Sequence, residues 1–363
     1  MLSKLFIRNK FFLPLLTIPI VMSLIGLIFI FEASSVRAIS ETGNSLHYFK
    51  LQATWLVLAL GLLIFFSRFD YKNLYFLSFI SMAVSILLLV VVLIPGIGYS
   101  AGGARRWIDF GFFNVQPTEL TKFSVIVYLA SWFKSSEKRR FMSFLSLISF
   151  LLFLIILQPD MGTAIIVMSL SLIIYYLAGM DLIKIFLMAP IGIGAIYLLI
   201  KSSPYRYNRL MAYLNPSSDP LGIGYHINQI LISLSNGGFI GSGFGASRQK
   251  YLFLPEAHTD SIFAIIGEEY GFIGGVILIT LYFVFVYKIY HLIRLAPDKL
   301  SKLLVGGIFA FFNLQVIINL AAMTGLFPLT GVPLPFLSYG GSNLLMSFAL
   351  IGILLNIEKK VRL

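Results

Sequence analysis

Long apolar runs alternate with short polar segments along almost the whole chain. Ten of these runs are typical of membrane-spanning helices, because about 20 consecutive apolar residues are needed to cross the hydrocarbon core of a bilayer as a helix. Barrel strands would instead show short stretches of alternating polarity, so a helical bundle is favoured. The predicted spans cover residues 11–31, 51–67, 74–95, 118–133, 142–157, 162–178, 183–201, 261–288, 303–326 and 336–356.

The predicted fold is therefore an all-α polytopic membrane protein of ten transmembrane helices. The first run follows three basic residues and is too long for a signal-peptide core, so we expect a retained span and a cytoplasmic N-terminus. An even number of spans places both termini on the same side. Residues 1–363 are expected to form one integral membrane domain, with a large extracytoplasmic loop, 202–260, between helices 7 and 8.

Composition and charge agree with this topology. The chain is 58% hydrophobic and only 12% charged, whereas about a quarter of the residues in a soluble domain are charged. On the predicted topology, 17 of the 27 Lys and Arg residues and five acids are cytoplasmic, so that side carries the whole net charge of +12. The basic charge is therefore a topology signal directed at anionic lipid, and a nucleic-acid partner is not expected.

Several common chemistries have no signature in this sequence. Cysteine is absent, which excludes disulfides and thiolate metal sites. No Gly-x-x-x-x-Gly-Lys loop is present, so use of ATP is not expected. The four histidines are too dispersed for a zinc site on one helix, and no Gly-x-Ser-x-Gly elbow indicates a serine nucleophile.

The outer segments carry the polar residues on which chemistry would depend. Ionisable groups in or beside membrane spans are costly and are functional hypotheses by default. Arg105 and Arg106 beside Trp107 form a cationic patch able to bind phosphate or stack on a sugar, although they also fit interfacial anchors. Glu119 and Lys122 are three residues apart on one predicted helix, so they either serve a site or form a local ion pair.

The end of the large loop is the densest polar stretch, and Asp260 is its main candidate for a base. Asp260 precedes an apolar helix start, where partial desolvation would raise the pKa of a carboxylate toward a useful value. Its rivals are Glu256, His258 and the pair Glu268 and Glu269, and Lys250 lies in the same stretch. The alternative is that Thr259 or Asp260 caps the helix that follows.

Three other segments are open to two interpretations. Gln158 to Thr163 contains a Pro-Asp turn that a helix connection explains as well as chemistry does. Gly237 to Gly245, which follows two amphipathic stretches at 206–214 and 225–234, either suits a close approach by another backbone or a phosphate or is a flexible turn between amphipathic helices. Ser338 lies among the prolines and glycines that open the last span, a pattern of cavity-lining broken helices or of tight packing.

Six motifs in this order resemble the SEDS family (shape, elongation, division and sporulation proteins), and its division branch more than its elongation branch. The resemblance covers nearly the whole chain. The matching strings are Gly103-Ala-Arg-Arg-Trp-Ile-Asp109, Gln116-Pro-Thr-Glu119 with Lys122, Gln158-Pro-Asp-Met-Gly-Thr163, Asp219-Pro-Leu-Gly-Ile-Gly-Tyr225, Leu254-Pro-Glu-Ala-His-Thr-Asp260 with Gly267-Glu-Glu269, and Pro333-Leu-Pro-Phe-Leu-Ser-Tyr-Gly-Gly-Ser342.

The resemblance implies a peptidoglycan glycosyltransferase that polymerises lipid II on the outer face of the bacterial cytoplasmic membrane. It assigns the essential catalytic role to Asp260 and functional importance to Trp107. It also implies a class B penicillin-binding protein as the crosslinking partner, alongside other division or elongation membrane proteins. Ser261, where many members carry Phe, is a departure that bears on partner contacts more than on chemistry.

The expected mechanism is an inverting transfer with undecaprenyl pyrophosphate as the leaving group. Asp260 is expected to take the proton of the acceptor hydroxyl, and Arg106, Lys122 and Lys250 are candidates to stabilise the pyrophosphate. No cofactor is required by the sequence, although Mg²⁺ or Mn²⁺ is a further candidate for that charge. A lipid II flippase and a non-enzymatic scaffold of the cell-wall machinery stay open as alternatives; the clustering of polar residues in the outer half favours catalysis.

Overall fold

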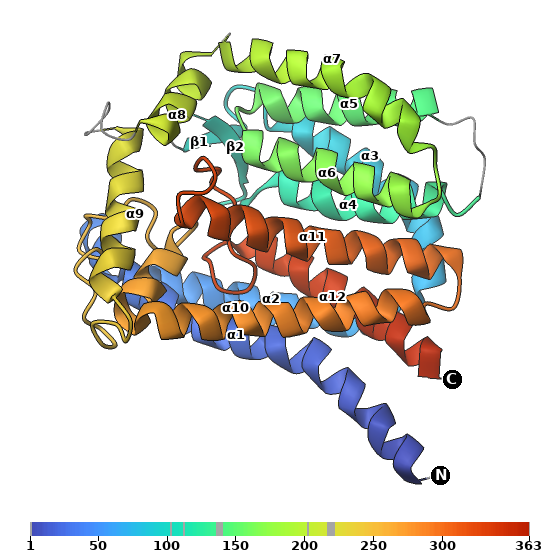
Figure 1. Ribbon diagram of the computed structural model, residues 1–363, viewed down its shortest axis with the longest axis horizontal. Helices are drawn as coiled ribbons and strands as arrows, with labels where there is room; N and C mark the ends of the chain where they lie inside the picture. The colour runs from blue at the N-terminus through green and yellow to red at the C-terminus, as the bar shows by residue number, and fades with distance from the viewer. Residues whose placement is uncertain are drawn as a thin grey trace.

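The protein is a helical bundle with two helices lying across one end (Figure 1). The computed structural model describes residues 2–101, 104–111, 113–135, 141–201, 203–215 and 222–362. Its helices are α1 (Leu2–Thr42), α2 (His47–Arg68), the 3-10 turn η1 (Tyr71–Asn73), α3 (Leu74–Val91), α4 (Pro117–Trp132), α5 (Phe141–Leu157), α6 (Met161–Leu177), α7 (Leu182–Lys201), α8 (Pro204–Leu214), α9 (Ile223–Gly237), α10 (Ile262–Leu295), α11 (Lys299–Met323) and α12 (Gly341–Arg362). Both termini lie at the end of the bundle away from α9 (Figure 1).

The predicted spans coincide with the long helices of the bundle, one helix for each. Within the described residues, five helical segments have the length and hydropathy to cross a membrane, and α5 and α6 are shorter apolar helices. The five are Pro14–Thr42, His47–Arg68, Tyr71–Val91, Ile262–Leu295 and Lys299–Met323. The chain is therefore an integral membrane protein; that all ten helices span the membrane stays a prediction.

Two predicted spans differ from the helices in a way that shapes the site. The last helix begins at Gly341 instead of residue 336, because the preceding residues form a turn in which Ser338 Oγ accepts a hydrogen bond from the Leu334 amide. The predicted span 261–288 continues to Leu295, and its helix is interrupted at Gly271, whose φ of 63° and ψ of −160° are non-helical.

The segments predicted to lie outside the membrane fold into regular structure that the apolar pattern did not predict in full. Residues 98–115 contain a three-stranded antiparallel sheet made of β1 (Gly98–Ala101), β2 (Ala104–Asp109) and β3 (Asn114–Val115). The amphipathic stretches of the large loop lie in α8 and α9, which cross the end of the bundle (Figure 1). The large loop is therefore a structured cover over the ends of the spans.

Aromatic packing anchors the turn before α12 in the core. Phe336, which is 2% exposed, stacks on Phe312 of α11 with ring centroids 5.4 Å apart and meets Phe285 of α10 edge-on. Tyr282 of α10 also donates a hydrogen bond to the carbonyl of Pro335. Because this turn is held by both helices, the residues just before it, 329–332, have a defined position beneath the large loop.

Candidate functional site

Asp260 lies at the end of the large loop, directly before α10, and is 8% exposed. The residue at the N-cap of α10 is Ser261, and it makes no side-chain capping bond. Asp260 instead accepts a hydrogen bond from the Thr259 hydroxyl, with Thr259 Oγ1 and Asp260 Oδ1 3.2 Å apart. The interpretation of Thr259 or Asp260 as a helix cap is therefore wrong, and capping does not account for this carboxylate.

Burial dominates the electrostatics of Asp260. Desolvation, supported by the nearby charge of Glu256, raises the pKa of Asp260 to about 6. The Thr259 hydrogen bond and the positive charge of Arg209 oppose this rise and leave it incomplete. A carboxylate with such a pKa is largely deprotonated at neutral pH and is basic enough to accept a proton from a reacting hydroxyl.

Two residues of the large loop, Arg209 on α8 and His226 on α9, belong to the same surroundings. The Nη1 atom of Arg209 donates to the carbonyl of Leu329 at 3.2 Å. The Nε2 atom of His226 lies 2.8 Å from the Oγ of Ser261, and burial lowers the pKa of His226 to about 4, so its ring is neutral at pH 7. Sequence reasoning missed both residues; their place on the polar sides of amphipathic stretches was the available signal.

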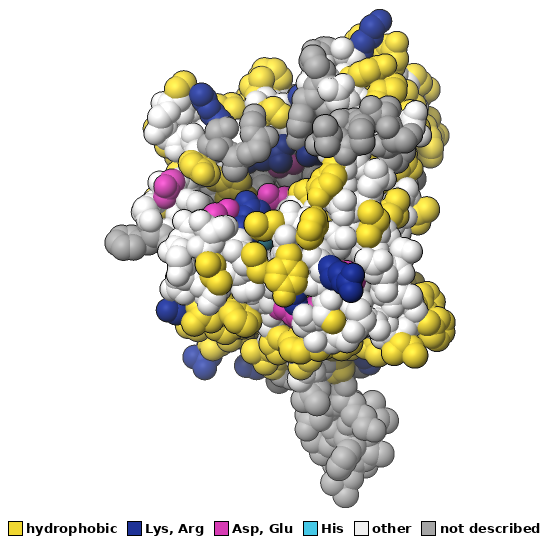
Figure 2. Space-filling model, turned by 90° about the vertical axis from the view of Figure 1, so that its left-hand side faces the viewer, with side chains coloured by type: hydrophobic (Ala, Val, Ile, Leu, Met, Phe, Trp, Pro, Cys, Tyr) yellow, Lys and Arg dark blue, Asp and Glu magenta, His cyan; other side chains and the backbone are white. Residues whose placement is uncertain are grey.

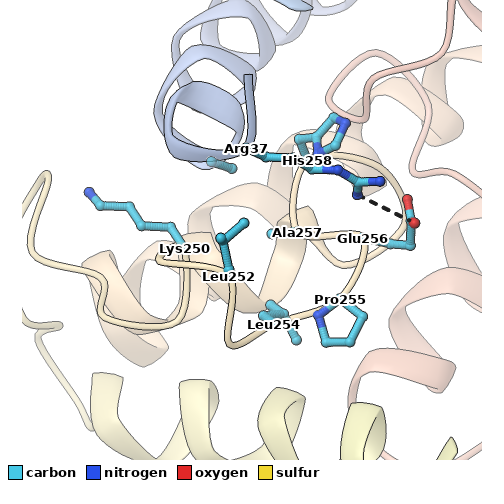
Figure 3. Close-up of a pocket in the computed structure, with 9 residues that line it drawn as sticks. Arg37, Lys250, Leu252, Leu254, Pro255, Glu256, Ala257 and His258 are labelled. Carbon is cyan, nitrogen blue, oxygen red and sulfur yellow. Dashed lines mark hydrogen bonds and ion pairs between the residues drawn. The ribbon is translucent and has the colours of Figure 1, made fainter. Parts of the chain in front are cut away.

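The segment from Lys250 to His258 packs against the C-terminal end of α1 (Figure 3). Arg37 of α1 forms an ion pair with Glu256 at 3.5 Å, and a cavity of about 120 Å³ lies between α1 and this segment. Charged and apolar side chains both line this cavity, Lys250 and Leu252 among them.

The ring of His258 is buried between two tyrosines. It lies 4.6 Å from the ring of Tyr48 and 5.5 Å from that of Tyr339, measured between centroids. Burial lowers the pKa of His258 to about 4, so the ring is neutral at pH 7. In this position His258 connects the loop to α2 and to the turn before α12.

Lys250 is engaged by carboxylates of the protein itself. Its Nζ lies 2.6 Å from Glu32 Oε1 on α1 and 3.5 Å from Glu269 Oε1 on α10, and it donates to the carbonyl of Gly245 at 2.7 Å. The surrounding acids raise the pKa of Lys250. The position is 8% exposed, so Lys250 joins α1, α10 and the loop.

The glycine-rich segment 237–245 closely approaches another backbone, so the close-approach interpretation describes it better than a flexible turn does. The amides of Ser242 and Gly243 donate to the carbonyls of Glu268 and Glu269 at 3.0 Å. On the other side of the break at Gly271, the Phe272 amide donates to the carbonyl of Gly238 at 3.0 Å. The segment thus provides the backbone partners that the interrupted helix α10 lacks.

Glu119 and Lys122 form a buried ion pair near the start of α4. Lys122 Nζ lies 2.7 Å from Glu119 Oε1, and the two side chains are 1% and 2% exposed. Asn343 of α12 donates to the other Glu119 oxygen at 3.0 Å and to Gln315 of α11 at 2.9 Å. This polar cluster joins three helices, and no contact connects it directly to Asp260 in the described part of the chain.

The residues of strand β2 lie beside the turn between α5 and α6. Arg105 is exposed and Trp107 is partly buried, opposite Tyr99 of β1. Arg106 Nε donates to the carbonyl of Gln158 at 3.2 Å, and Arg106 also bonds the carbonyl of Pro159. In that turn, Asp160 caps α6 by accepting from the Thr163 amide at 3.1 Å, so a structural role accounts for it.

The turn between α5 and α6 links β2 to α8. Arg206 of α8 donates to the carbonyl of Ile156, at the end of α5, at 3.1 Å. Arg209, one turn further along α8, reaches the 329–332 segment next to Asp260. Seen from this end, the surface is hollowed, with basic and acidic side chains inside the hollow (Figure 2).

Of the remaining residues predicted for the site or its motifs, some are buried and others lie outside the described residues. Ser338 is 5% exposed and is part of the turn before α12. Its carbonyl accepts a hydrogen bond from the side chain of Gln52 at 3.4 Å. Residues 102–103 and 219–221, which belong to two of the motifs, lie outside the described residues. Within the described residues, no group of three or more His, Asp or Glu side chains is arranged as metal ligands. We therefore assign no ligands to Mg²⁺ or Mn²⁺.

Comparison with known proteins gives consistent matches over the whole chain. The model of the FtsW/RodA/SpoVE cell cycle protein family matches residues 13–363. A probable peptidoglycan glycosyltransferase FtsW from Trichlorobacter lovleyi is 39% identical over 100% of this chain and 97% of its own length. The stage V sporulation protein E of Bacillus subtilis is 36% identical over 96% of this chain and 97% of its own length.

Solved structures show the same fold. A chain from a peptidoglycan synthase complex, described as coordinating polymerization and crosslinking, superposes with a TM-score of 0.76 at 25% identity, covering 96% of this chain and 97% of that one. The rod shape determining protein RodA of Thermus thermophilus superposes with a TM-score of 0.71 at 24% identity, covering 96% of each chain.

Proposed function

This chain belongs to the FtsW/RodA/SpoVE family of cell cycle proteins, and we propose that it polymerises lipid II into β-1,4 glycan strands on the outer face of the bacterial cytoplasmic membrane. The relatives named probable peptidoglycan glycosyltransferases support the same enzymatic class for this chain. The observation that supports the proposal most is Asp260, a buried carboxylate with a raised pKa at the end of the large loop.

In the proposed reaction Asp260 is the general base. Its carboxylate takes the proton of the 4-hydroxyl of the acceptor sugar as that oxygen bonds to the anomeric carbon of the donor. The bond from the anomeric carbon to the pyrophosphate oxygen breaks, and undecaprenyl pyrophosphate leaves with the electron pair. A single displacement converts the α-linked donor into a β-linked product, which needs one base and positive charge at the leaving group.

Arginines fit the leaving group better than the two buried lysines do. Lys122 and Lys250 are each within 3 Å of a carboxylate oxygen, so much of their charge is compensated inside the protein. Arg206 and Arg209 on α8 are part-buried, and Arg105 on β2 is exposed. Arg206 and Arg209 each donate to a backbone carbonyl as well, and we propose the guanidinium groups of β2 and α8 for the pyrophosphate because such groups bind phosphate oxygens in a bidentate manner.

The distribution of buried charge favours catalysis at one face over translocation of a lipid. The buried acidic and basic side chains of the described residues include Glu32, Glu119, Lys122, Asp160, Lys250, Asp260, Glu268 and Glu269, which lie toward the end of the bundle that carries α8 and α9. Glu358, near the C-terminus, is the exception. A flippase would be expected to line a path through the full membrane depth with polar groups.

The topology and the partner belong to the same proposal. We place both termini in the cytoplasm and the large loop outside, in agreement with the excess of Lys and Arg in the predicted cytoplasmic segments. A class B penicillin-binding protein is the proposed partner, because a similar chain was solved in a peptidoglycan synthase complex that couples polymerization to crosslinking. Division is the favoured process, given the FtsW-named relatives.

The test is reconstitution of the purified protein with lipid II, with and without a class B penicillin-binding protein, followed by gel analysis of the glycan product. Wild-type protein is expected to form polymer, whereas the Asp260→Ala and Asp260→Asn variants are expected to form none above background. Equal polymer from these variants would refute Asp260 as the base. Movement of lipid II across vesicles without any polymerisation would refute the enzymatic proposal and favour a flippase.

A further inference from the structure

The segment that carries Asp260 is held from two sides by uncharged groups of other helices. On one side, the His226 ring of α9 faces the Oγ of Ser261 at 2.8 Å and the carbonyl of Pro255. On the other side, Asn319 of α11 donates from Nδ2 to the carbonyl of Asp260 at 2.9 Å. Both contacts are made to residues that adjoin or include Asp260, and neither is made to its carboxylate.

Asn319 is placed to fix the backbone of Asp260 relative to the core. Its Nδ2 also donates to the carbonyl of Val332 at 2.8 Å, so one amide group bridges the loop and the segment before the α12 turn. The side chain is 1% exposed, and its loss would leave two buried carbonyls without that donor. A buried amide that uses both protons on two separate segments is a geometric constraint, since either segment moves only if a bond breaks.

His226 constrains the same segment from the large loop. Its low pKa keeps the ring neutral, so it holds Ser261 without adding a charge that would compete for the Asp260 carboxylate. The charged groups that act on Asp260 come from other positions, Glu256 on its own loop and Arg209 on α8. His226 therefore affects the position of Asp260 more than its charge.

We infer that His226 and Asn319 are positioning residues for the reaction, and that together they hold Asp260 in line with the acceptor hydroxyl by clamping residues 255–261 between α9 and α11. This inference rests on the proposed function of Asp260. Displacing a catalytic group by about 1 Å costs up to about 100-fold in rate. Loss of either clamp residue should consequently lower kcat while leaving KM for lipid II nearly unchanged.

The experiment measures kcat, KM and their pH dependence for lipid II polymerisation by the full-length protein with its transpeptidase partner. We expect Asn319→Leu and His226→Leu to lower kcat by about 10- to 100-fold with KM within about twofold of the wild type. His226→Gln, whose amide can reach Ser261, should recover part of the loss. Asn319→Asp should move the acid limb of the profile to higher pH, because a carboxylate next to the Asp260 backbone disfavours ionisation of Asp260.

Two matched substitutions control for general disturbance of the same helices. Asn313→Leu removes an amide of α11 that bonds only within its helix, to the carbonyl of Phe309 at 2.8 Å, and His291→Gln replaces a histidine near the other end of α10. Both should retain the wild-type kcat. His226→Gln keeps a side chain able to bond Ser261 in place, so it remains informative if the leucine variants do not fold.

The outcomes separate this inference from the proposed function. If Asp260→Asn is inactive while Asn319→Leu and His226→Leu keep the wild-type kcat and pH profile, the clamp is refuted and the base assignment stands. The clamp is also refuted if these variants raise KM alone or lose activity only in proportion to lost folded protein. Polymerisation by Asp260→Asn at the wild-type rate would refute the proposed base, whatever the clamp variants do.

Discussion

Two kinds of buried carboxylate lie near the same end of this protein, and they differ in their partners. Glu119 and Glu32 each lie within 3 Å of a lysine ammonium, at 2.7 Å and 2.6 Å. Asp260 is also buried, yet its carboxylate accepts a hydrogen bond from a hydroxyl at 3.2 Å and takes part in no ion pair among the described residues. The first kind joins helices, whereas the second retains the basicity that proton transfer needs.

The largest expected effect separates activity from stability at Asp260. Asp260→Asn should reduce polymerisation by about 10²- to 10⁴-fold, the usual contribution of a general base. The same substitution should leave the melting temperature unchanged or raise it at pH 7, because it removes a charge that burial disfavours. Thermal unfolding of the purified protein beside a lipid II assay measures both. A loss of activity accompanied by a large loss of stability would remove the contrast with the paired carboxylates.

The next effect concerns the buried pair of Glu119 and Lys122. Lys122→Met should destabilise the protein by about 3–5 kcal/mol, because it leaves Glu119 buried without its cation. The double variant Glu119→Gln, Lys122→Met should recover most of that loss. Thermal and denaturant unfolding in detergent provide the comparison. If Lys122→Met were fully stable but inactive, Lys122 would act on substrate, as the sequence suggested.

A smaller effect is expected in the glycine-rich segment that caps the broken helix α10. A Cβ at Gly241 would lie 2.1 Å from the carbonyl oxygen of Glu269, and its φ of 92° is unfavourable for alanine. Gly241→Ala should lower the unfolding free energy by about 3 kcal/mol. Gly243→Ala should lower it by about 1 kcal/mol, because Gly243 has a similar φ but a Cβ added there would meet open space. Equal losses of unfolding free energy for the two variants would contradict the close approach to α10.

The smallest effect is expected at the ion pair between Arg37 and Glu256. The side chains are 35% and 50% exposed, so Arg37→Gln should change the unfolding free energy by less than about 1 kcal/mol. Any loss of stability should weaken further in high salt, where exposed charges are screened. A cost similar to that of Lys122→Met would mean that exposure does not distinguish the pairs.

Much of the fold was accessible from the apolar pattern, because a bilayer imposes a length on every span. The ranges predicted as spans lie on the long helices, and amphipathicity marked the stretches that became α8 and α9. The pattern failed where backbone interactions between distant segments decide the structure. The break at Gly271 is stabilised by residues 237–243, and the late start of α12 by a turn at Ser338; neither depends on local hydrophobicity.

The candidate site was predictable in its charges and less so in its geometry. Asp260 stood out because a carboxylate precedes an apolar helix. Whether a nearby cation pairs with a carboxylate depends on tertiary contacts such as that between Lys250 and Glu32, which are 218 residues apart. His226 was marked only by its place in an amphipathic stretch. Asn319 carries no charge and adjoins Asp260 only through the fold, so periodicity and composition do not identify it.

The pH dependence of lipid II polymerisation tests the central claim most directly. Because burial raises the pKa of Asp260 to about 6, and only its deprotonated form can accept a proton, kcat/KM should fall tenfold per pH unit below an acid limb near pH 6. An unperturbed aspartate would place that limb near pH 4. The account predicts that the limb appears near pH 6 in the wild type and disappears with the activity in Asp260→Asn. Full activity maintained down to pH 4.5, or an unchanged limb in an active Asp260→Asn variant, would contradict it.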